Sequence, residues 1–135
     1  MEYLDGHERP IRDDIRKFHE SNPCVACGEI HNIIIDHKND LYNDERVLNK
    51  TTQTFDDFQP LCNSCNLKKR QICKKTKETG ERYSATNIPI LAVFGIDFIE
   101  GSKQFNINDK NAMVGTYWYD PVRFTNFIKI VLKSQ

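Results

Sequence analysis

Four cysteines in two CxxC pairs are the residues of this sequence best suited to chemistry. Cys24 and Cys27 form one pair, Cys62 and Cys65 form the other, and 34 residues separate the pairs. Two such pairs can close one tetrahedral thiolate site, which suits Zn²⁺ by ligand softness and coordination number. Because four thiolates leave no coordination position open, the spacing predicts a structural zinc that supports folding. The fifth cysteine, Cys73, is expected to be an inert buried thiol.

Three further residues lie at fixed places relative to these pairs. Asp36 and His37 follow an apolar run nine residues after Cys27, and Asn66 comes directly after Cys65. This order of CxxC, strand, Asp-His, loop, LCxxCN and basic helix resembles the zinc-containing HNH nucleases. It is most similar to the members with Asn at the last motif position, which include endonuclease VII-type junction resolvases and several HNH-type restriction endonucleases. The resemblance covers residues 24–70.

The resemblance implies roles for these residues in hydrolysing a DNA phosphodiester. His37 would be the general base, since the pKa of an imidazole ordinarily lies near about 6.5. Asp36 and Asn66 would offer hard oxygen ligands to a catalytic Mg²⁺ or Mn²⁺. The zinc would hold the strand end and the helix start together. Asp57 stands where the family motif has its middle Asn, and its carboxylate could accept the same backbone hydrogen bonds.

A run of basic side chains begins just after Asn66, in a segment whose only acidic residues are Glu78 and Glu81. Because the net charge of the chain is zero, this local segregation of charge is what predicts contact with phosphates. A solvated helix face is the alternative interpretation. The side chains expected to contact DNA are Lys68, Lys69, Arg70, Lys74 and Lys75, with Lys77 and Arg82 further along the same run.

Phosphate contacts do not read sequence, so base recognition needs other side chains. Asn, Gln and Arg are the residue types that make paired hydrogen bonds to base edges. Such residues occur in two polar segments, 39–54 and 103–111. The candidates in the first segment are Asn39, Asn43, Arg46, Asn49 and Gln53. The aromatic residues 117–119 are expected in the core or a subunit interface instead.

Hydrophobic periodicity predicts the elements that precede and carry the Asp-His pair. An amphipathic helix is expected over residues 9–20, with Ile11, Ile15 and Phe18 on one face. The β-branched run 33–35 predicts a short strand that leads directly into the Asp-His pair. The polar segment after this strand has no periodicity and is expected to be a long loop.

The second half of the chain is expected to contain two helices and a buried apolar segment. A basic helix should run from Asn66 to Gly80, and the nearly continuous apolar segment 88–99 should be buried. A last helix should begin at Asp120, because Asp caps helices well and Pro121 suits the first helical position. Its apolar face should hold Phe124, Phe127, Ile128 and Val131.

Composition bounds the class of protein. The 135 residues allow one compact domain, and no run of 18 apolar residues is present to span a membrane. The polar N-terminus predicts a cytoplasmic protein, in which paired cysteines favour metal binding over disulfides. We expect an α+β fold with a ββα-metal (HNH) core held by a structural four-cysteine zinc. Residues 1–82 would form an N-terminal helix and this core, and residues 83–135 a mixed C-terminal subdomain used for packing, dimerisation or DNA recognition.

The leading functional hypothesis is a metal-dependent, site-specific endonuclease of the restriction type that acts on double-stranded DNA. The segments DHKNDLYND and GTYWYDP are weakly similar to HNH-type restriction endonucleases. The alternatives are a Holliday-junction-resolving or low-specificity HNH nuclease and a zinc-containing DNA-binding module without catalysis. One nuclease site cuts one strand, so double-strand cleavage suggests a homodimer. The apolar C-terminal third could be its interface or simply internal core.

Overall fold

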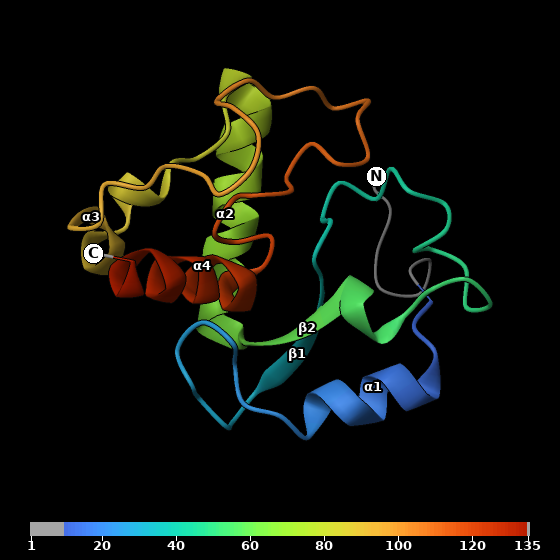
Figure 1. Ribbon diagram of the computed structural model, residues 1–135. Coiled ribbons are helices and arrows are strands. Elements are labelled where there is room, and N and C mark those ends of the chain that lie inside the picture. Colours follow the sequence, from blue (N-terminus) through green and yellow to red (C-terminus); the bar gives the residue numbers. More distant parts are fainter. Residues whose placement is uncertain (1–9, 135) are drawn as a thin grey trace.

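A two-stranded antiparallel sheet, contacted by two helices, lies at the centre of the computed structural model, which describes residues 10–134 (Figure 1). The chain is α+β, as expected. The elements in order are α1 (Asp13–Glu20), β1 (Ile33–His37), β2 (Phe58–Cys62), α2 (Asn63–Thr79), α3 (Pro89–Ala92) and α4 (Pro121–Lys133), with single 3₁₀ turns η2 (Phe55–Asp57) and η3 (Ala85–Asn87).

The sheet has a different helix on each face. Strand β1 contains the predicted run 33–35 and continues through Asp36 and His37, which lie opposite Gln59 and Phe58 of β2. Successive residues of a strand point to opposite faces. Helix α1 therefore packs on the face of Phe58, where Ile15 is fully buried, and α2 reaches the face of Asp36 through Lys69.

Helix α1 differs from its prediction at both ends of its apolar face. It begins at Asp13, with Arg12 as N-cap, so Ile11 precedes the helix; residue 9 of the predicted span lies outside the described residues. Phe18 is 53% exposed, whereas His19 is buried and its ring Nε2 donates to the carbonyl of Phe55 at 2.9 Å. A helix of two turns buries one narrow row, and the position four residues after Ile15 is that of the histidine.

Helix α2 begins three residues earlier than predicted. Cys62 is its N-cap, and the Sγ atom accepts a hydrogen bond from the backbone N–H of Cys65 at 3.5 Å. The second cysteine pair is thus part of the helix start, and Asn66 lies within the first turn. Gly80 ends the helix in a left-handed conformation with φ of 72°, as predicted. The row that α2 buries consists of Cys65, Lys69, Cys73 and Thr76.

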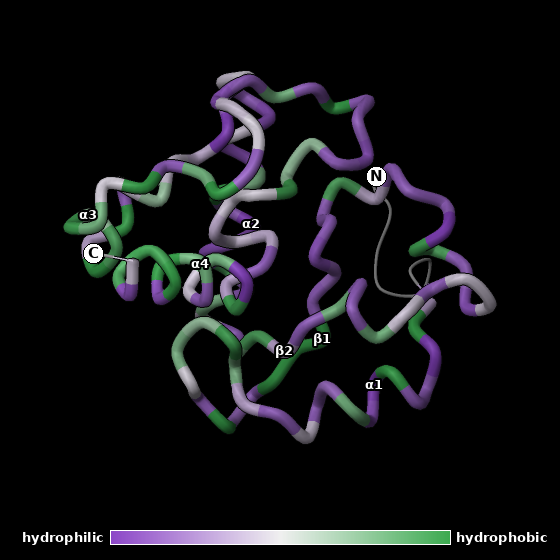
Figure 2. Tube along the Cα trace, viewed as in Figure 1, coloured by the Kyte–Doolittle hydropathy of each residue, from purple (hydrophilic) through white to green (hydrophobic). Residues whose placement is uncertain are grey.

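The segment 88–99 is mostly not buried, contrary to expectation. Only Leu91 of α3 is fully inside, whereas Val93 is 82% exposed. An apolar run is buried only where other elements cover it, and the short α3 turns a single residue toward α4. Figure 2 shows the resulting concentration of apolar residues along α3 and α4.

Helix α4 closes the C-terminal cluster. It begins as predicted, with the carboxylate of Asp120 accepting from the backbone N–H of Arg123 at 3.1 Å. Phe124 and Ile128 point inward to Tyr117, while Phe127 stays partly exposed. Trp118 packs against both this cluster and the cysteine cluster. Within residues 10–134, no helix combines the length and apolar character needed to cross a membrane.

Candidate active site and metal centre

The four paired cysteines come together at one point, where the first pair meets the junction of β2 and α2. The Sγ atoms of Cys24, Cys27, Cys62 and Cys65 all lie within 4.8 Å of one another. Tetrahedral Zn–S bonds of about 2.3 Å would place sulfur atoms about 3.8 Å apart, and those of Cys27 and Cys62 are 3.6 Å apart. The cluster is therefore compatible with a zinc site.

Backbone hydrogen bonds shape the first cysteine pair for metal binding. Gly28, at φ of 83°, donates to the carbonyl of Cys24 at 2.9 Å and closes the turn. Val25 donates to the carbonyl of Pro60 at 3.0 Å, which fixes this turn to the free edge of β2. Burial raises the pKa of Cys24, but backbone hydrogen bonds to its sulfur outweigh burial and lower that pKa to about 7. Such donors favour the thiolate form that a metal ion binds.

The carboxylate of Asp36 is buried and is held through one of its oxygen atoms. Its Oδ2 accepts from the ammonium of Lys69 at 2.6 Å and from the amide of Gln59 at 3.0 Å. Burial raises the pKa of Asp36, and the Lys69 ammonium opposes that shift. Both Lys69 and Gln59 donate to Oδ2, and neither donates to the other oxygen, Oδ1. A carboxylate oxygen is the kind of ligand atom that a hard cation prefers.

His37 and Asn66 complete the set predicted from sequence. The imidazole of His37 is buried and packs edge-on against Tyr42 and Phe58, with ring centroids 5.2 and 4.9 Å away. Asn66 is partly buried in the first turn of α2, one turn before Lys69. Because Lys69 contacts Asp36 directly, the end of β1 and the first turns of α2 lie against each other.

The side chain of Asp57 does not reach the histidine segment. It accepts from the backbone N–H of Thr54 at 2.7 Å and from both guanidinium nitrogens of Arg46, at 2.6 and 3.0 Å. These hydrogen bonds cap η2 and outweigh burial, so the pKa of Asp57 is lowered. The contact with the segment after His37 comes from the main chain, since Lys38 donates to the Asp57 carbonyl at 3.1 Å.

The basic run after Asn66 divides into exposed and buried side chains. Lys68, Arg70, Lys74 and Lys75 are exposed, as a DNA-binding surface requires. Lys69 is only 3% exposed and its ammonium is engaged by Asp36, so it is a core residue and not part of that surface. The expectation for Arg82 is corrected in the same way. Its guanidinium is buried and donates to the carbonyls of Glu100 and Val114 at 2.7 and 2.9 Å.

The two segments considered for base recognition are bound to each other. The side-chain amide of Asn39 is buried and donates to the carbonyl of Lys110 at 3.1 Å, and that of Asn43 donates to the carbonyl of Ile107 at 2.9 Å. Gln53 is also buried and donates to the carbonyl of Val47 at 2.9 Å. These three amides therefore help to hold the loops in place.

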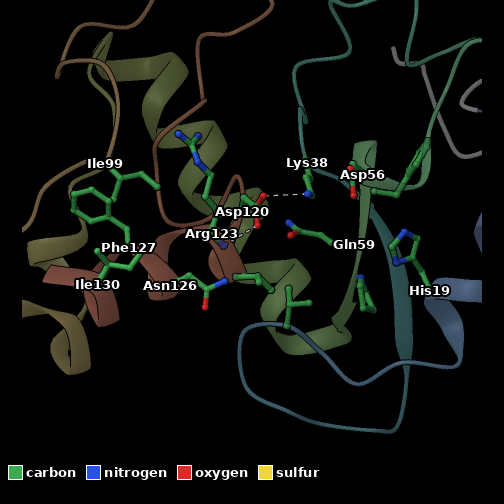
Figure 3. A pocket seen from close by; sticks show the side chains of 14 residues that line it. His19, Lys38, Asp56, Gln59, Ile99, Asp120, Arg123, Asn126, Phe127 and Ile130 are labelled. Carbon is green, nitrogen blue, oxygen red and sulfur yellow. Dashed lines mark hydrogen bonds and ion pairs between the residues drawn. The ribbon is translucent and has the colours of Figure 1, made fainter. Parts of the chain in front are cut away.

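A groove of about 740 Å³ opens between β2 and α4, beside the end of β1 (Figure 3). Lys38 and Asp120 form an ion pair of 3.0 Å there. The Gln59 amide that holds Asp36 also donates to the carbonyls of Trp118 and Tyr119, at 3.4 and 3.1 Å. Sequence reasoning missed Gln59. Its place opposite Asp36 follows from the strand register, which the sequence does not state.

Comparison with known proteins identifies the family of this chain. A family model described as "ICEA Protein" matches residues 3–134. The chain belongs to the ICEA family. This ICEA-family chain is 40% identical over 119 residues to the type II restriction enzyme NlaIII of Neisseria lactamica. The match covers 84% of the ICEA-family chain but 50% of NlaIII, so the chain spans about half the length of that relative. No solved structure is significantly similar to it.

Proposed function

We propose that this chain is a metal-dependent DNA endonuclease of the restriction type with an HNH (ββα-metal) core. The observation that carries the proposal is the junction of β1 and α2. There Asp36 and His37 end a strand beside the helix turn that contains Asn66, and the four-cysteine cluster lies at the base of that helix. The similarity to a type II restriction enzyme favours restriction over junction resolution or low-specificity cleavage.

In this proposal His37 and the metal ligands divide the hydrolysis of a phosphodiester between them. His37 accepts the proton of the attacking water, a role for which an imidazole suits neutral pH. Its packing against Tyr42 and Phe58 fixes the plane of the ring. Asp36 offers an anionic carboxylate oxygen and Asn66 offers an uncharged amide oxygen. Both are ligand types that Mg²⁺ and Mn²⁺ prefer, so the two residues fit a divalent cation. When bound, that cation supplies charge neutralisation at the phosphate and the leaving oxygen.

The flank of α2 that carries Asn66 is the surface that we propose for the DNA backbone. Successive residues of an α-helix are rotated by about 100°, so Arg70 and Lys74 lie within about 80° of Asn66. By the same rotation Lys68 and Lys75 lie about 180–200° away, beyond the buried row. Arg70 and Lys74 are therefore the expected phosphate contacts, and Lys68 and Lys75 are expected to face solvent.

Residues 83–135 are proposed to form a C-terminal subdomain that supports dimerisation. One nuclease site cuts one strand at a time, so concerted cleavage of both strands of double-stranded DNA favours a twofold homodimer. The exposed side chains Ile90 and Val93 of the α3 region and Ile130 of α4 offer apolar surface for it. Analytical ultracentrifugation of the DNA-bound protein tests this part of the proposal.

The test of the proposed function is cleavage of a plasmid by the zinc-loaded protein with Mg²⁺ or Mn²⁺. We expect discrete products from the wild type and a loss of about 10²–10⁴ in rate for His37→Gln. His31→Gln is the matched control, because His31 is exposed next to the first cysteine pair. Because His37 is buried, thermal unfolding of each variant must be compared first. DNA binding without cleavage by the wild type would instead support a DNA-binding module.

A further inference from the structure

Lys69 has an environment that is rare for a lysine. It is 3% exposed, and lysines are almost never buried unless they are paired. Its ammonium donates to Oδ2 of Asp36 at 2.6 Å and to the carbonyls of His37 and Lys38, both at 3.0 Å. An ammonium has three donors, and here each has an acceptor. The three acceptors belong to three consecutive residues at the end of β1.

This geometry does more than neutralise a buried carboxylate. Two of the three acceptors are main-chain carbonyls, so the ammonium fixes the path of the chain as it leaves β1 at His37. The third acceptor of the ammonium is Oδ2 of Asp36, and the amide of Gln59 donates to the same oxygen. These two hydrogen bonds thereby restrict the rotation of the Asp36 carboxylate.

We propose that Lys69 is a positioning residue of the active site, a fixed internal cation that orients Asp36 and His37 and weakens the binding of the divalent cation. This inference rests on the proposed function. The ammonium adjoins the same carboxylate that would hold the metal, so the two cations repel each other. Removing the ammonium should strengthen metal binding to the ionised carboxylate, because the competing charge is lost. The same change frees the strand end and should slow the reaction. The comparison is made at mildly alkaline pH, because burial raises the pKa of Asp36 and Lys69 opposes that rise.

The experiment compares Lys69→Met with the wild type as zinc-loaded proteins, using Mn²⁺ as the probe. Mn²⁺ affinity is measured by calorimetry and by the Mn²⁺-induced rise in Tm, and turnover is measured at saturating Mn²⁺. We expect Mn²⁺ to bind roughly tenfold more tightly to Lys69→Met and kcat to fall by at least about tenfold. A residue with only a structural role would not produce these opposite changes, because general loosening weakens metal binding and turnover together.

Two further variants, Lys69→Arg and the control Lys17→Met, complete the test. Arginine keeps the charge but cannot place three donors as an ammonium does, so we expect wild-type Mn²⁺ affinity with a lower kcat, even if Lys69→Met fails to fold. Lys17→Met removes an exposed lysine charge from α1 and should leave Mn²⁺ affinity and kcat unchanged. Wild-type Mn²⁺ affinity and kcat in folded Lys69→Met, or wild-type kcat in Lys69→Arg, would overturn the inference alone. Absence of any Mn²⁺ effect on the wild type would overturn the proposed function and this inference with it.

Discussion

Replacing Arg70 and Lys74 together by alanine tests on which flank of α2 the DNA lies. Both side chains are exposed and share the flank of Asn66. If each neutralises one phosphate, the slope of log affinity against log salt should fall in magnitude by about 1.8, or about 0.9 per contact. Over a fourfold rise in salt, the wild type should then lose about tenfold more affinity than the double variant.

The assay is fluorescence anisotropy of a labelled DNA duplex, titrated without divalent metal between about 50 and 200 mM NaCl. Lys68→Ala with Lys75→Ala is the matched control, because it removes two charges from the same helix on the opposite flank. Its overall affinity should change slightly through bulk charge, but its salt slope should stay near that of the wild type. The reasoning is refuted if both double variants lower the slope equally, or if only the control does.

Three further perturbations test other parts of the structure. Cys24→Ser, or a strong zinc chelator, should abolish cooperative unfolding of residues 24–70, because structural zinc contributes folding free energy directly; a well-folded protein without zinc by metal analysis would contradict this. Asp57→Asn should lower the free energy of unfolding by about 1–2 kcal/mol at neutral pH. The pKa of Asp57 is lowered from 3.8, so its stabilisation is present above that value and is lost as the pH falls through the folded-state pKa. Urea denaturation should therefore show that the difference in free energy of unfolding between wild type and Asp57→Asn shrinks in acid. Gly115→Ala should cost more than about 2 kcal/mol, since Gly115 has φ of 97° and a Cβ there would collide with the carbonyl of Glu100; Gly95→Ala, with positive φ but open space, should cost less in the same thermal unfolding assay.

The parts of the fold that the sequence predicted correctly depend on local chemistry. The spacing of the cysteines alone predicted that four sulfur atoms would meet, and the structure confirms it. Gly80 and Asp120 were identifiable because helix ends need a left-handed residue and a side-chain acceptor, respectively. The β-branched run before Asp36 was sufficient to predict the strand. None of these features needs a partner distant in sequence, except the cysteine cluster, whose two pairs are 34 residues apart.

The errors arose where distant contacts decide the outcome. A lysine within a basic run is expected to face solvent, but Lys69 is buried because Asp36, 33 residues earlier, provides its counter-charge. The start of α2 was placed too late because the capping atom is a cysteine sulfur, which is not among the usual capping groups. The apolar segment containing Val93 was expected inside, although no described element covers most of it.

The hydrogen bonds between Gln59 and the segment 118–120 limit how residues 24–70 can be transferred to another protein. The amide of Gln59 joins Asp36 to the carbonyls of Trp118 and Tyr119, and Lys38 joins the same strand end to the N-cap of α4. A graft of residues 24–70 onto another scaffold would leave the Gln59 amide and the Lys38 ammonium without these acceptors. Residues 24–70 are therefore not a self-contained structural unit. Any C-terminal part that replaces this one must supply acceptors for the same two side chains.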